Sequence, residues 1–205
     1  MGRLILALAV GLLGAAVVHI AVIFAIPALA GNNAWARLGR LGDMNAVVRL
    51  DALRSEATDG TEPASDRLRT DFAFVDPGFV TAGCRFSLAE GPVRLAAGQR
   101  TEFWSASIYS RRGDNLYSIN DRSAVEGQFD LLVGTADQLV EARANSADRD
   151  ETAIPVTIAS VEAYLTLRAL VDEESKRPGV DAFVSSVTCE PVEEPSAGIS
   201  PSRES

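Results

Sequence analysis

The 205-residue chain carries 28 acidic and 19 basic side chains, a formal net charge of −9, and 47% apolar residues. This length predicts one globular domain, or two that are both small, and the apolar content excludes global disorder. The acidic balance argues against nucleic-acid binding, because such an interface needs a basic face that displaces counterions from phosphate.

The residue inventory also removes much catalytic chemistry. His19, which lies in the apolar amino-terminal run, is the single histidine, and Lys176 is the single lysine. Serine and cysteine nucleophiles usually need a histidine base, and catalytic zinc and non-haem iron usually need histidine ligands. Lys176 lies in a charged run, residues 172–177, that is typical of a solvated turn. We therefore assign no catalytic residue and expect neither a metal ion nor a cofactor.

The first residues are typical of a membrane segment. The run from Leu4 to Ala30 has no charged side chain and exceeds the roughly 20 apolar residues that cross a bilayer. A cleaved signal peptide is the alternative, because Ala28-Leu29-Ala30 before Gly31 matches a small-x-small cleavage site. We favour an uncleaved anchor over residues 1–31, since the apolar core of a signal peptide has only about 7–15 residues.

The next segment reads as a connection between anchor and domain. Residues 32–71 are assigned to a juxtamembrane segment and linker, with Trp35 placed as an aromatic anchor at the membrane interface. Residues 55–70 are polar, contain Gly and Pro, and lack apolar periodicity, which is typical of a linker. The folded domain is expected over residues 72–190, and the Pro-, Ser- and Glu-rich residues 191–205 as a disordered tail that begins near Glu190.

Period-two alternation predicts a mainly β domain. Several short apolar stretches alternate with polar residues and are separated by turn signals such as Glu90-Gly91-Pro92 and Gly113-Asp114-Asn115. The run 161–171 has helix-favouring composition, but its strict alternation favours a strand. Residues 178–188 predict a short helix that begins at a proline. The pattern predicts an antiparallel sandwich or half-barrel with one short carboxyl-terminal helix. The other expected strands cover 79–88, 93–95, 103–109, 116–119, 129–133 and 154–158.

Three local motifs carry a resemblance to a known group of proteins. They are Cys84-Arg85-Phe86, Phe103-Trp104-Ser105, and Gly113-Asp114-Asn115 followed by Tyr117-Ser118-Ile119-Asn120-Asp121-Arg122. With them, the chain resembles the small membrane-anchored bacterial proteins assigned to domain of unknown function 1254, which is related to domain of unknown function 1214. The similarity covers about residues 79–189. It implies a β-rich domain outside the cytoplasm, tethered to a bacterial inner membrane, and it implies no activity.

Orientation decides how the cysteines are interpreted. Arg37, Arg40 and Arg49 after the span weakly favour a cytoplasmic carboxyl side, but the positive-inside rule is weak for long translocated domains. We follow the resemblance and the cysteine count, and place the domain in the periplasm. There Cys84 and Cys189 favour a disulfide that fastens the final helix to the first strand and stabilises by roughly 4–5 kcal/mol. Two separate buried thiols are the alternative.

One polar cluster is a candidate ligand site. Asn115, Asn120, Asp121 and Arg122 offer oriented hydrogen bonds and a planar fork for carboxylate or phosphate, and Trp104 with Tyr109 would add a stacking wall. The structural alternative, which we favour, has the Asn and Asp side chains capping turns, Arg122 paired with Asp121 or with a carbonyl at the sheet edge, and Trp104 in the core.

Three functions remain open from the sequence. The first is an envelope interaction or structural role for a single-pass inner-membrane protein, with membrane lipid and another envelope protein as partners. The second is a periplasmic module that binds a small ligand through the Asn-Asp-Arg cluster. The third is a hydrolase built on two carboxylates, which requires two carboxyl groups facing each other in a cleft, one with a raised pKa.

Overall fold

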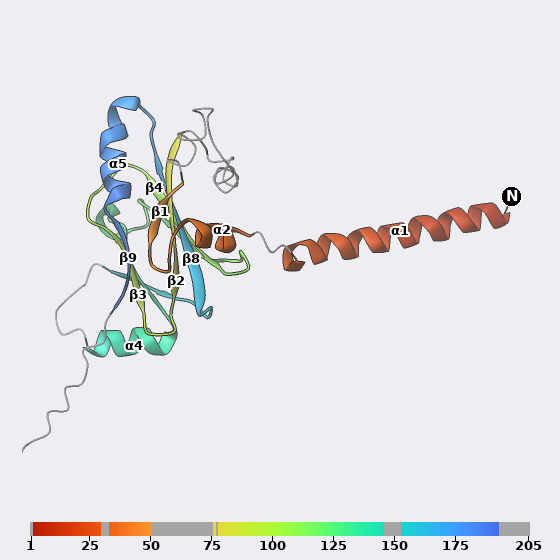
Figure 1. Ribbon diagram of the computed structural model, residues 1–205, viewed down its shortest axis with the longest axis horizontal. Coiled ribbons are helices and arrows are strands. Elements are labelled where there is room, and N and C mark those ends of the chain that lie inside the picture. Colours follow the sequence, from red (N-terminus) through yellow and green to blue (C-terminus); the bar gives the residue numbers. More distant parts are fainter. Residues whose placement is uncertain (1, 30–32, 51–75, 77, 146–152, 193–205) are drawn as a thin grey trace, which may run out of the picture.

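The computed structural model describes residues 2–29, 33–50, 76, 78–145 and 153–192, and Figure 1 shows a long amino-terminal helix and a body built around β-strands. The helices are α1 (Gly2–Leu29), α2 (Ala34–Leu41), α4 (Ala136–Asn145) and α5 (Arg177–Ser185), with two 3-10 turns, η3 (Val125–Gly127) and η4 (Glu174–Lys176). The strands are β1 (Val47–Arg49), β2 (Phe79–Ser87), β3 (Val93–Ala97), β4 (Trp104–Ser110), β5 (Asn115–Asn120), β6 (Asp130–Gly134), β7 (Ile154–Thr157), β8 (Glu162–Leu170) and β9 (Val187–Pro191).

The described strands form two sheets, which confirms the predicted mainly β fold. One sheet has the order β1-β2-β8-β4-β5 and the other β7-β6-β3-β9. The pairs are antiparallel, except that β6 and β7 run parallel. The parallel pair follows from α4, which connects these two strands as a crossover helix,.

The core lies between the two sheets and is closed by a covalent link. Alternate residues of β2, β4 and β8 face those of β3 and β6, and the edge of Trp104 packs on Phe129 with ring centroids 5.2 Å apart. Cys84 on β2 and Cys189 on β9 form a disulfide with an S–S distance of 2.08 Å across this core, which confirms the predicted bridge. Because Cys189 belongs to β9, the bridge joins the two sheets and does not fasten the final helix, as the sequence suggested.

α1 has the properties of a membrane span. Residues Gly2–Ala25 are long and apolar enough to cross a bilayer, and none of the most apolar window is buried inside the protein. This agrees with the expected single span, since an exposed apolar helix of this length needs an apolar surrounding.

The region after α1 differs from the expectation. Trp35, predicted as an interfacial anchor, is only 7% exposed and packs with Leu38, Leu50 and Tyr164 on the outer face of the larger sheet. Gly83 on β2 makes this close approach possible, because a Cβ there would lie 3.2 Å from a methyl group of Leu38. Residues 34–50 therefore pack on the body through α2 and β1, although the sequence places them in a connecting segment.

The carboxyl-terminal elements are also more extensive than predicted. The run 161–171 is a strand, β8, as its alternation indicates. The expected helix 178–188 ends at Ser185, and its last residues open the edge strand β9. Glu190 and Pro191 thus belong to a strand and not to the tail. α4 was not predicted, because its apolar residues do not form a regular stripe. The predicted linker, residues 55–70, and most of the predicted tail lie outside the described residues.

Candidate functional site

The structure separates Trp104 from the rest of the predicted ligand cluster. On β4, Trp104 points into the core and is fully buried, and its indole N–H donates to the Gly127 carbonyl over 2.9 Å. Asn120 lies on β5 next to the buried Ile119 and therefore faces the opposite side of the sheet. Trp104 and Asn120 do not share a surface, so the proposed stacking wall does not form.

The asparagines of the cluster make local turn contacts. The Asn120 Oδ1 accepts from the Ser123 backbone N–H and hydroxyl, both at 3.2 Å, and Asn115 Nδ2 donates to Ser118 over 2.9 Å. Arg122 is exposed and makes no ion pair with Asp121 within the described part of the chain, where one Asp121 carboxylate oxygen is buried without a hydrogen-bond partner. These residues line neither of the two cavities described below.

A different polar surface covers the outer face of the larger sheet. Side chains alternate along β4. Trp104, Ala106 and Ile108 point into the core, so Ser105, Ser107 and Tyr109 point outward. On the neighbouring strand β8, Thr166 and Arg168 face the same way. The strand register places Ser105 opposite Arg168 and Ser107 opposite Thr166. We call these four residues, with Ser118, the serine–arginine face; they are Ser105, Ser107, Ser118, Thr166 and Arg168.

The serine–arginine face is shallow, polar and open. A depression of about 90 Å³ is lined by Ser105, Ser107, Tyr109, Thr166 and Arg168. The Arg168 side chain is exposed, and its guanidinium has no partner among the described residues. The hydroxyls of Ser107 and Ser118 bond each other at 2.9 Å, which fixes their positions on adjacent strands. The planar guanidinium of Arg168 beside these hydroxyls is suited to bind a carboxylate or phosphate that belongs to a molecule with further polar groups.

Aromatic residues and α2 close one end of this face. The Tyr109 and Tyr164 rings stack with centroids 5.2 Å apart, and Tyr164 packs against Trp35 of α2. Arg85 lies over the Trp35 ring at 5.1 Å and donates to the Gly42 carbonyl over 3.2 Å. Burial raises the pKa of Tyr164, and the neighbouring Tyr109 raises it further, so this phenol is neutral at physiological pH. The closed end therefore combines aromatic rings with the cationic Arg85.

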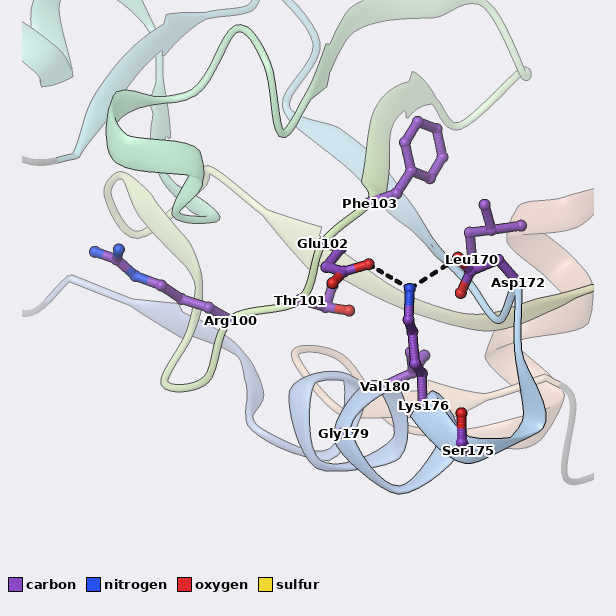
Figure 2. A pocket seen from close by; sticks show the side chains of 10 residues that line it. All are labelled: Arg100, Thr101, Glu102, Phe103, Leu170, Asp172, Ser175, Lys176, Gly179 and Val180. Atoms are coloured by element: carbon purple, nitrogen blue, oxygen red, sulfur yellow. Dashed lines mark hydrogen bonds and ion pairs between the residues drawn. The ribbon is translucent and has the colours of Figure 1, made fainter.

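The larger cavity lies at the other end of the body and contains the single lysine. Its volume is about 340 Å³, and Figure 2 shows Lys176 reaching between Glu102 and Asp172. The Lys176 Nζ donates to Glu102 over 2.7 Å and to Asp172 over 2.9 Å. The other residues that line the cavity are Arg100, Thr101, Phe103, Leu170, Ser175, Gly179 and Val180.

The electrostatics of this cavity do not match a carboxylate-based hydrolase. The hydrogen bonds that Lys176 donates to Glu102 and then to Asp172 raise the pKa of Lys176, and the second of them lowers the pKa of Asp172. A general acid needs a carboxyl group with a raised pKa, so that it is protonated at the working pH. The ammonium group instead holds Asp172 ionised and ties the loop before β4 to the segment before α5. Among the described residues, no group of three or more His, Cys, Asp or Glu side chains is arranged to hold a metal ion.

The chain is similar to solved structures but matches no family model. Neither protein-family models nor curated proteins match the chain. Among solved structures, it is similar to the VPA0106 protein from Vibrio parahaemolyticus, at 9% identity and a TM-score of 0.48, over 58% of this chain and 29% of that one. It is also similar to an uncharacterized protein from Burkholderia cenocepacia, at 13% identity and a TM-score of 0.37, over 62% of this chain and 33% of that one. The chain thus spans about a third of either solved protein's length.

Proposed function

We propose that the protein is a single-pass bacterial inner-membrane protein whose β-sandwich lies in the periplasm and binds an anionic ligand of the envelope. The cross-sheet disulfide between Cys84 and Cys189 supports the location, because disulfides persist in oxidising compartments and are rare in the cytosol. The exposed apolar helix α1 supports the anchor. The motifs that resemble domain of unknown function 1254 proteins agree with this assignment.

The observation that carries the binding role is Arg168 on the serine–arginine face, which has no partner in the part of the chain that the structure describes. A strand residue that serves only solubility can be any polar type, whereas here Arg168 lines a depression together with three hydroxyl-bearing strand residues and Tyr109. A carboxylated sugar matches this chemistry: its carboxylate pairs with the guanidinium fork, and its hydroxyls bond those of Ser105, Ser107 and Thr166.

The binding role is tested with a matched pair of sugars. N-acetylmuramic acid and N-acetylglucosamine share a ring and differ by the ether-linked lactyl carboxylate of the former. We expect saturation-transfer NMR with the full chain in neutral phosphatidylcholine nanodiscs to show N-acetylmuramic acid binding and little N-acetylglucosamine binding. The change Arg168→Gln should reduce the signal at least fivefold.

Arg122→Gln is the control, because Arg122 is also exposed and without a partner among the described residues, but lies outside the serine–arginine face. It should leave the signal unchanged. Equal signals from the two sugars, or equal losses in the two variants, would contradict the proposed site. The location is tested separately with reporters fused to the carboxyl end: an alkaline phosphatase fusion should be active and a green fluorescent protein fusion dark. The reverse result would place the domain in the cytoplasm.

A further inference from the structure

We propose that the β4–β5 turn rests with Arg112 on anionic phospholipid headgroups of the membrane that holds α1. The turn comprises Ser110 to Asn115 and carries Arg111 and Arg112 at its exposed tip. This inference rests on α1 spanning a membrane. It does not depend on ligand binding by the serine–arginine face, so the two proposals fail independently.

Chain length places the turn close to the bilayer. A 28-residue helix such as α1 is about 42 Å long, the thickness of a bilayer with its headgroups. α1 ends at Leu29 and the N-cap of α2 is Asn33, and this stretch of chain covers at most about 14 Å when extended. Asn33 Nδ2 in turn donates to the Arg111 carbonyl over 3.1 Å. The turn is therefore held beside the end of the anchor.

Figure 1 agrees with this placement, since α2 and the green turn after β4 lie on the side of the body nearest α1. The first turn of α2 is fixed to Asn33 as well, through the Ala36 N–H to Asn33 Oδ1 bond of 3.0 Å. The start of α2 and the β4–β5 turn thus form one connected unit.

Internal hydrogen bonds make the turn rigid. The Ser110 hydroxyl donates to the Asp114 carboxylate over 2.7 Å, and the Ser110 N–H donates to the Asp114 carbonyl over 2.8 Å. The Gly113 N–H donates to the Ser110 carbonyl over 2.9 Å, and Gly113 has a φ of 97°, which favours glycine. A rigid turn presents its side chains with little loss of conformational entropy on docking.

The charges of the turn contrast with the acidic chain. The Arg111 guanidinium is paired with Glu162 at 2.7 Å and lies 6.0 Å from the Trp35 ring centre. The Arg112 guanidinium is exposed and has no partner in the described parts of the chain. An unpaired guanidinium at headgroup level binds phosphate strongly, and basic residues near a membrane are attracted to anionic lipids. Anionic headgroups are therefore the occupant that position and charge both indicate.

The test uses Trp35 as a reporter beside the turn. The chain has two tryptophans, so Trp104→Phe leaves Trp35 alone. The full chain is reconstituted into vesicles of phosphatidylcholine, with or without about 30% phosphatidylglycerol, that contain a phosphatidylcholine spin-labelled on its headgroup. We expect headgroup quenching of Trp35 to be at least twofold stronger in the anionic vesicles, and 0.5 M salt should remove the difference.

Arg112→Gln should remove at least half of the increase caused by phosphatidylglycerol, whereas Arg122→Gln should leave it unchanged. Equal quenching in the two kinds of vesicle, or an increase that survives Arg112→Gln, would overturn the proposal and favour a protein partner for the turn. If Trp104→Phe prevents folding, amide hydrogen exchange of residues 110–114 in the unmodified chain tests the proposal instead. Exchange should be at least threefold slower in anionic than in neutral nanodiscs, and equal exchange would overturn the proposal.

Discussion

Replacing Cys84 and Cys189 together with alanine removes the covalent link between the two sheets. The bridge closes a loop of 105 residues, for which the chain-entropy relation gives a stabilisation of about 4.7 kcal/mol at 25 °C. Both cysteines are at most 2% exposed, so alanine places no polar group in the core. We expect the free energy of unfolding to fall by about 4 kcal/mol.

This loss is measured by unfolding the full chain in detergent micelles with guanidinium, using near-UV circular dichroism of the tryptophans as the signal. The denaturant slope should increase, because an uncrosslinked denatured chain exposes more surface. Reduction of the unmodified chain with dithiothreitol serves as the control and should produce the same loss. A loss below about 1 kcal/mol with an unchanged slope would refute the reasoning that the bridge restrains the denatured chain.

Three further changes test the packing. Arg94→Ala should lower the free energy of unfolding in urea by about 2–3 kcal/mol, because Arg94 makes a bidentate pair with the buried carboxylate of Asp130, although the Arg94 side chain itself is partly exposed to water. A loss near zero would contradict this. Gly83→Val should displace α2 and lower the free energy of unfolding by about 1–3 kcal/mol, because a Cβ there would lie 3.0 Å from the Leu165 carbonyl oxygen and 3.2 Å from a Leu38 methyl group. A red shift of tryptophan emission would report the displacement, and an unchanged spectrum would count against this packing. The contribution of Tyr164 to the free energy of unfolding should be fully present below about pH 10 and decline as the pH rises toward the raised pKa of Tyr164, since the folded state favours its neutral phenol. Absorbance at 295 nm during alkaline unfolding checks this. A Tyr164→Phe variant with the same decline would contradict it.

The β-strands could be predicted because their alternation is a local property. Inward Ala163, Leu165 and Leu167 alternate with outward residues along β8, and this pattern outweighed a helix-favouring composition. Helix α2 was missed for the opposite reason. Trp35 after an apolar span resembles an interfacial anchor, and only the Leu38 contact with Gly83, far along the chain, shows that it packs on the body.

The candidate site depended on strand pairing that the sequence does not display. The outward positions Ser105, Ser107, Thr166 and Arg168 can be read from the alternation of β4 and β8, but their adjacency follows only from the register of these two strands. The predicted cluster was chosen by closeness in sequence. That criterion grouped Asn120 with Trp104, which lies on the opposite face of the same sheet.

The redox state of the two cysteines in living cells tests the proposed location most directly. Cells are lysed into N-ethylmaleimide, the protein is reduced, and a second, heavier maleimide is added before mass spectrometry. We expect Cys84 and Cys189 to carry only the second label, because the bridge forms outside the cytoplasm. If both cysteines carry the first label, the thiols were reduced in the cell, and the β-sandwich is not in an oxidising compartment.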